Sequence, residues 1–290
     1  MNPEYDRLFL HHEKKANWKN WGPYLSERAW ATVREDASFD GDIWNSFSHD
    51  QSRSRVYRWG EDGIGGFSDR FGRICLSFAF WNGKDPILKE RLFGLTNPEG
   101  NHGEDVKELY FYLDGTPTHS YMKMLYKYPQ EPFPYEKLVQ ENKKRTLHDP
   151  EFELLDTGIF NENRYFDIMI EYAKENEETI LARVSITNRG PQEALIHCLP
   201  QVWLRNTWKW GYPKGPTGDD GPKRMLKFDN SSLQLDGYFF YFDNNPNFLF
   251  TENEPDKKDA FHHYIVHGDK KKLNQNSAGS KAGAHYQTYL

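Results

Sequence analysis

Residues 165–187 read YFDIMIEYAKENEETILARVSIT and decide the fold. Every second residue from Phe166 to Tyr172 is large and apolar or aromatic, a period of two that predicts a β-strand with one buried face. Residues 179–187 repeat the alternation with Ile180, Val184 and Ile186. Because only the polar residues 174–178 separate the two runs, the natural interpretation is an antiparallel hairpin.

Further runs of the same kind lie on both sides of this hairpin, separated by turns rich in Gly, Pro and Asn. Helical patterns are few and short. The sequence therefore predicts one domain over residues 1–290 that is mainly β, a large antiparallel β-sandwich (super-sandwich) with few short helices. The expected strands are 73–81, 108–113, 121–128, 194–204, 232–235, 238–242, 247–251 and 261–267, and the expected helices are 4–15, 27–33 and 135–144.

Composition narrows the class of protein. The chain has 290 residues, a net charge of −6, 37% hydrophobic and 16% aromatic residues. With no basic patch, nucleic acid is a poor candidate partner. No apolar stretch approaches the ~20 residues of a membrane span, and the polar start does not have the pattern of a secretory signal. Without a secretory signal, Cys75 and Cys198 are expected to be buried thiols rather than a disulfide, and the cytosol is the simplest compartment. The sequence indicates no cofactor.

The last residues suggest that the chain belongs to something larger. Residues 284–290 have the character of a strand, and the polar residues 274–283 before them have that of a connecting loop. A domain seldom ends on an apolar strand whose edge is unpaired. We therefore expect the chain to be the N-terminal part of a longer protein.

Residues 88–135 are the densest in turn formers, aromatic residues and acids. Gly and Pro turns alternate there with runs such as 110–112 and 121–128, and the turns carry Glu99, His102, Glu104 and Asp105. A rigid loop that presents carboxylates and flat rings suits a polar ligand such as a sugar.

Stronger catalytic signatures are missing from the sequence. Glycoside hydrolysis needs two carboxylates, but neighbouring acids on a strand point to opposite faces, so the doublets 35–36, 61–62 and 104–105 are not catalytic pairs in themselves. The His pairs 11–12 and 262–263 stand at no standard metal-ligand spacing. The Gly-rich residues 60–66 lack the Lys of a phosphate-binding loop.

Tryptophans gather in two regions, six within residues 18–81 and three within 203–210. Most of them are expected in an aromatic core. Trp208 and Trp210, however, belong to residues 208–213, which run into a loop rich in Gly and Pro over residues 214–222. Rings in such a loop form either a platform for a sugar or a contact with another domain.

Residues 21–36 (WGPYLSERAWATVRED), 52–71 (SRSRVYRWGEDGIGGFSDRF) and 85–128 closely resemble the N-terminal region of bacterial glucosidase-like proteins related to glycoside hydrolase family 63, the mannosyl-oligosaccharide glucosidase family. Within the third stretch, residues 90–103 (ERLFGLTNPEGNHG) are long and unusual enough to be specific. The resemblance extends over essentially the whole chain. It implies a protein several-fold longer, with a β-sandwich followed by an (α/α)6 barrel. In the family, that barrel carries both the general acid and the general base. That barrel is absent here, so no catalytic residue is carried over. Ala37 stands where the family is expected to have Tyr.

Two hypotheses follow. In the first, the chain is the accessory sandwich of a glucosidase-like hydrolase that cleaves α-glucosidic bonds of oligosaccharides; it is inactive alone, packs on the barrel and helps to shape the substrate mouth. In the second, it is an independent carbohydrate-binding module that uses the Trp208 loop. A self-sufficient hydrolase is a third, weaker reading. The candidate mouth or interface residues are Trp21, Glu27, Arg28, Arg34, Glu35, Asp36, Trp59, Glu61, Asp62, Glu99, His102, Glu104, Asp105, Trp208 and Trp210.

Overall fold

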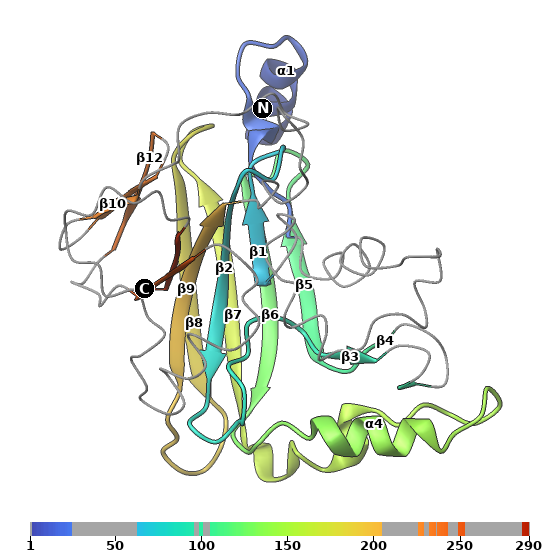
Figure 1. Cartoon of the computed structure of the whole chain (residues 1–290). Coiled ribbons are helices and arrows are strands. Elements are labelled where there is room, and N and C mark those ends of the chain that lie inside the picture. The colour runs from blue at the N-terminus through green and yellow to red at the C-terminus, as the bar shows by residue number, and fades with distance from the viewer. Residues whose placement is uncertain are drawn as a thin grey trace, which may run out of the picture.

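The computed structural model describes residues 2–24, 63–95, 99–100, 105–204, 226–228, 232–235, 237–242, 249–252 and 286–289. Over these residues the chain is mainly β and its strand pairings are antiparallel, as the sequence predicted (Figure 1). The strands are β1 (Ile64–Ser68), β2 (Ile74–Trp81), β3 (Gly94–Leu95), β4 (Asp105–Val106), β5 (Leu109–Gly115), β6 (Tyr121–Pro129), β7 (Tyr165–Lys174), β8 (Ile180–Asn188), β9 (His197–Leu204), β10 (Leu226–Phe228), β11 (Ser232–Leu235), β12 (Tyr238–Tyr241), β13 (Leu249–Glu252) and β14 (Tyr286–Tyr289).

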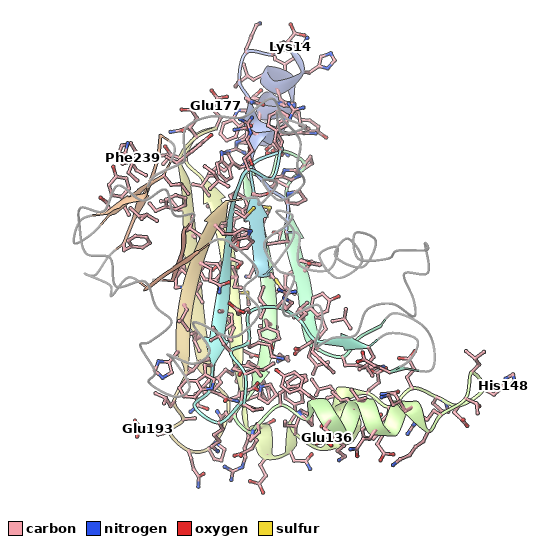
Figure 2. The ribbon with its side chains drawn as sticks, viewed as in Figure 1. Lys14, Glu136, His148, Glu177, Glu193 and Phe239 are labelled. Carbon is pink, nitrogen blue, oxygen red and sulfur yellow. The ribbon has the colours of Figure 1, made fainter. Side chains whose placement is uncertain are left out.

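Helices are few within the described ranges. They are α1 (Pro3–His12), α4 (Tyr135–Lys143) and the short 3-10 turns η1 (Trp18–Asn20), η2 (Leu154–Thr157) and η3 (Asn161–Asn163). Lys14, just after α1, and Glu136 of α4 lie at opposite ends of the molecule (Figure 2). Neither helix is long and apolar enough to cross a membrane. The expected helix 27–33 and strand 261–267 lie outside the described residues.

Two sheets form the main core. A four-stranded sheet has the order β5-β6-β7-β8, and a five-stranded sheet has the order β1-β2-β9-β14-β13. The buried face of β6 and β7 packs against β1, β2 and β9 in a single apolar cluster. Aromatic rings bridge the two sheets: the centroids of Phe67 and Tyr172 are 4.7 Å apart, and those of Phe80 and Tyr126 are 6.2 Å apart.

β1 is a strand that the sequence did not reveal, because residues 60–66 read as a Gly-rich loop. Two glycines explain its place in the core. A Cβ on Gly65, whose φ is +61°, would lie 2.9 Å from the Ile170 side chain of the facing sheet. A Cβ on Gly63 would lie 2.2 Å from Ser77 Oγ. Glycine therefore lets β1 approach both neighbours, and the Tyr172 hydroxyl donates to the Gly65 carbonyl at 2.7 Å.

β14 corrects one expectation. It lies between β9 and β13 and pairs with both, so it is not the unpaired edge that the sequence suggested. Because β14 lies inside the five-stranded sheet, an unpaired edge no longer supports the expectation that the chain stops within a strand.

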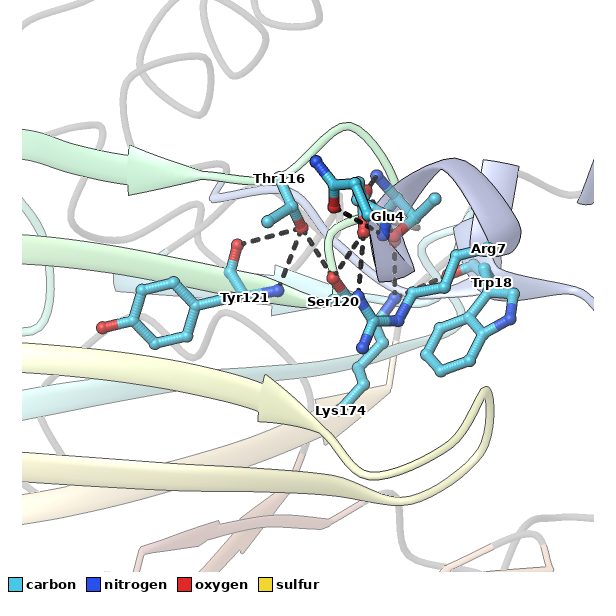
Figure 3. Close-up of polar contacts among 9 residues, drawn as sticks. Glu4, Arg7, Trp18, Thr116, Ser120, Tyr121 and Lys174 are labelled. Atoms are coloured by element: carbon cyan, nitrogen blue, oxygen red, sulfur yellow. Dashed lines mark hydrogen bonds and ion pairs between the residues drawn. The ribbon is translucent and has the colours of Figure 1, made fainter. Parts of the chain in front are cut away.

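Polar contacts help to hold the N-terminal segment, residues 2–21, against the sandwich. They add to the buried ring of Trp21, because α1 itself buries none of its residues (Figure 3). The Lys174 ammonium, at the end of β7, donates to the carbonyls of Trp18 and Trp21, each at 2.7 Å, and to that of Thr118 at 3.3 Å. The Glu4 carboxylate accepts from the backbone and hydroxyl of Thr118, both at 2.7 Å. One cation and one anion thus fasten the segment to the β5–β6 turn.

The sandwich core predicts a contrast between two substitutions. Ile168→Ala empties a fully buried site between the sheets and should lower the free energy of unfolding by about 2–5 kcal/mol. Leu181→Ala on the neighbouring strand, where the side chain is 62% exposed, should change it by no more than about 0.5 kcal/mol. Urea unfolding followed by Trp fluorescence measures both, and equal losses would contradict the assigned core.

Lys174 predicts a pH dependence. Burial lowers the pKa of its ammonium to about 8, and the nearby Glu4 carboxylate partly opposes that shift. Because the unfolded chain keeps the proton up to about pH 10.4, it binds more protons than the folded chain between pH 8 and that value. The folded state should therefore gain stability across this window relative to Lys174→Met. Unfolding of both proteins from pH 7 to 10.5 measures the difference, and a difference independent of pH would refute the shift.

Candidate functional site

A buried ion pair lies within residues 88–135, the segment that the sequence singled out. The Lys89 ammonium donates to Glu108 Oε1 at 2.7 Å, and the two side chains are 1% and 0% exposed. The backbone of Lys89 exchanges two hydrogen bonds of 2.9 Å with Phe80, which ties residue 89 to β2. Glu108 directly precedes β5. The pair therefore links one sheet of the sandwich to the other.

Further groups satisfy both charges. Glu108 Oε1 also accepts the backbone N–H of Phe93 at 3.0 Å, and its Oε2 accepts the Tyr126 hydroxyl at 3.0 Å. The ammonium lies 3.7 Å from the ring centroid of Phe133 and 4.5 Å from that of Tyr135. Aromatic faces attract a desolvated cation, so the rings replace part of the hydration that Lys89 loses.

A second carboxylate lies in the same region. Asp85 is 1% exposed, and its Oδ2 accepts the hydroxyl of Tyr128 at 3.0 Å and that of Tyr135 at 3.4 Å. The rings of Tyr126 and Tyr128 stack with centroids 5.9 Å apart. The tyrosines thus connect Asp85 to the pair, and we call Asp85, Lys89, Glu108, Tyr126, Tyr128 and Tyr135 the buried polar cluster.

Burial dominates the electrostatics of this cluster. It raises the pKa of the Glu108 carboxyl, and the Lys89 ammonium opposes that rise. It also raises the pKa of Asp85, again against the attraction of Lys89. The pKa of the Tyr126 and Tyr128 hydroxyls is raised well above its ordinary value, first by burial and then by the neighbouring carboxylates. The tyrosines therefore stay protonated and act as donors.

The cluster fixes the base of a hairpin. Gly94 and Leu95 of β3 pair with Val106 and Asp105 of β4, and the Lys107 N–H donates to the Phe93 carbonyl at 2.9 Å. The side chain of Lys107 is 1% exposed, and its ammonium binds Glu151 and Glu153, which lie just before η2. Residues 107 and 108 are thus both anchored by charged contacts beside the paired strands β3 and β4.

The cluster brings carboxylates, an ammonium and hydroxyls together, but its charged groups are shielded from solvent. An acid or base must come within hydrogen-bond reach of the atom whose proton it moves. Asp85 is 1% exposed, and the side chains of Lys89 and Glu108 are 1% and 0% exposed, which excludes a substrate from this state of the cluster. Among the described residues, no group of three or more His, Cys, Asp or Glu side chains could hold a metal ion. The geometry supports positioning and does not support catalysis.

The candidate residues from the sequence have different positions. Trp21 is a core residue, 5% exposed, with its ring stacked 5.6 Å from that of Phe67. Asp105 lies in β4 at the hairpin base, and Glu99 is half-buried in the segment that the hairpin carries. The remaining candidates lie outside the described residues: Glu27, Arg28, Arg34, Glu35, Asp36, Trp59, Glu61, Asp62, His102, Glu104, Trp208 and Trp210.

Sequence reasoning missed Asp85, Lys89 and Glu108. A signal was present for Glu108, because the alternation expected over residues 108–113 places it on the same face as Tyr110 and Tyr112. Tyr110 packs against the main core, so that face is the inner one. No such pattern in the sequence marks Lys89, because its partner Glu108 lies 19 positions further along the chain.

Comparison with known proteins gives one relative. The chain is 41% identical over 331 aligned positions to "Uncharacterized protein YMR196W" of Saccharomyces cerevisiae, and the alignment covers 98% of this chain. The chain spans only 30% of the length of the yeast protein. No protein-family description matches the chain, and no solved structure matches it.

The buried pair predicts strong coupling between its partners. Lys89→Met and Glu108→Gln should each lower the free energy of unfolding by about 3–5 kcal/mol, because each leaves a buried charge uncompensated. The double variant should lose about 1–3 kcal/mol less than the sum of the single losses. Urea unfolding of all four proteins gives the cycle.

A matched control uses the exposed pair of Lys84 and Glu131, whose charged atoms are 2.5 Å apart. Lys84→Met should cost no more than about 1 kcal/mol, because water screens that pair. Additive losses at Lys89 and Glu108, or a loss of equal size at Lys84, would show that the buried pair has no special role.

Proposed function

We propose that this chain is the accessory β-sandwich of a longer, glucosidase-like glycoside hydrolase. In this proposal it contributes no catalytic residue. It packs on a catalytic (α/α)6 barrel and shapes the mouth through which an oligosaccharide reaches the α-glucosidic bond to be cleaved. The barrel is its partner within the same protein.

The observation that carries the proposal is the use made of residues 88–108. Three of their charged side chains anchor a hairpin: Lys89 and Glu108 form a buried ion pair at its base, and Lys107 binds two glutamates. A hairpin whose base is fixed in this way loses less conformational entropy when it docks than one with a free base. Such a hairpin suits contact with a neighbouring domain better than it suits chemistry of its own.

Two further observations support the proposal. The resemblance to the glucosidase family includes residues 90–103, which lead into and fill the hairpin. The yeast relative is more than three times as long as the part that aligns with this chain, which leaves room for a barrel.

The cytosol is the compartment that we propose for this domain. Cys75 and Cys198 are both free thiols, and burial raises the pKa of Cys198 to about 12. Free thiols are usual where the cell keeps its proteins reduced.

The proposal predicts no turnover of a chromogenic α-glucoside by the 290-residue chain alone. It predicts binding of the chain to the rest of the yeast relative, produced as a separate protein, and α-glucosidase activity of the two together. Replacing both His102 and Glu104 by Ala should weaken that binding about tenfold, because the proposed interface would lose both side chains. Asn176→Ala in the exposed turn between β7 and β8 is the control and should leave it unchanged.

Two results would overturn the proposal. Turnover by the chain alone would make it an enzyme. Titration calorimetry that shows gluco-oligosaccharides binding to the chain, together with no association with the remaining region, would make it an independent carbohydrate-binding module.

A further inference from the structure

An open groove lies at the α4 end of the sandwich, on the side away from α1 (Figure 1). It has a volume of about 440 Å³ and lies between the start of α4 and the turn that joins η2 to η3. Cavities that hold small ligands begin at roughly 300 Å³, so the groove has room for one small molecule. It shares no residue with the buried polar cluster.

The charges that line the groove balance. Glu131 and Glu162 bring two carboxylates, and Lys137 and Arg164 bring two cations. Glu131 is paired with Lys84 outside the groove, and the Lys137 ammonium donates to the Thr157 carbonyl at 3.3 Å. An anion would meet the two carboxylates, and a cation would meet the two bases. The lining therefore favours a ligand without net charge.

Arg164 is held in a fixed orientation. Its Nε donates to Glu162 at 2.9 Å, and a terminal nitrogen donates to Gln192 at 2.9 Å. A guanidinium fixed on two sides is an oriented donor, and the side-chain amide of Asn161 adds a donor and an acceptor nearby. Carboxylates, an amide and a guanidinium together match hydroxyl groups, which both donate and accept.

The groove also has an apolar surface and a constrained rim. Pro134 and Ile159 line it with carbon atoms. Glu162 and Asn163 have φ values of +58° and +57°, a conformation that costs non-glycine residues of order 1 kcal/mol each. Hydrogen bonds such as that from Arg164 N to Asn161 O at 3.3 Å maintain the turn. The polar side chains of the rim are thus presented beside an apolar patch.

From these features we propose that the groove binds a neutral, polyhydroxylated small molecule of monosaccharide size, with its C–H surface on Pro134 and Ile159 and its hydroxyls on Asn161, Glu162 and Arg164. Lys137 closes one side as a further donor. This site is independent of the proposed accessory role, because it does not involve the hairpin or any barrel.

The experiment titrates the 290-residue chain, labelled with ¹³C at isoleucine methyl groups, with methyl α-D-glucopyranoside. The Ile159 signal, assigned with Ile159→Val, should shift and saturate at millimolar concentrations, as expected for so small a ligand. Ile168 and Ile170 are fully buried in the main core, and their signals should not move. Inorganic phosphate and L-arginine methyl ester serve as the anionic and cationic probes and should bind at least tenfold more weakly.

Lys137→Met should weaken binding about tenfold, since a hydrogen bond from a charged donor is lost. Lys144→Met is the matched control at the C-cap of the same helix; the side chain of that lysine is 66% exposed, pairs with Glu141 and does not line the groove. Its binding should equal that of the original chain. No saturable shift of Ile159, tighter binding of phosphate or of the cation, or equal loss in both variants would each overturn the proposal, whatever the outcome for the accessory role.

Discussion

The ion pair of Lys89 and Glu108 is the contact on which the position of the β3–β4 hairpin depends, because it joins the two sheets at the base of that hairpin. A buried pair of this kind adds little net stability compared with apolar residues of the same size, but loss of either partner is costly. Its value here is geometric: Glu108 orients the Phe93 backbone and the Tyr126 hydroxyl at the same time. The Glu108 carboxylate therefore fixes the position of the β3–β4 hairpin.

Buried lysines recur wherever an irregular segment meets the sandwich. Lys89 is surrounded by a carboxylate and two rings, Lys107 by two glutamates, and Lys174 by three backbone carbonyls. A fully buried lysine is rare and needs partners, so each one fixes the segment that supplies those partners. The strands provide a stable double layer, and the lysines determine where the N-terminal segment and the hairpin lie on it.

Much of the fold could be predicted from the sequence, whereas little of the site could. In strands with strict alternation, such as β7, every second residue is buried, so the sequence alone shows which face is buried. β1 could not be recognised, because its glycines are explained only by the side chains of Ser77 and Ile170, which other parts of the chain bring to it. Trp21 looked like an interface residue for a similar reason, since its stacking partner Phe67 is distant in sequence. The family resemblance drew attention to the hairpin, but only the three-dimensional pairing of Lys89 with Glu108 shows how the base of the hairpin is held.

The account rests on the claim that the hairpin base is as firmly fixed as the core beneath it. Amide hydrogen exchange of the 290-residue chain under native conditions tests this claim most directly. The Phe93 and Lys107 amides, which donate to Glu108 and to the Phe93 carbonyl, should exchange as slowly as that of Ile168 in β7, through global unfolding. Exchange as rapid as that of the exposed turn at residues 144–149 would show that the base opens freely, and would contradict the account.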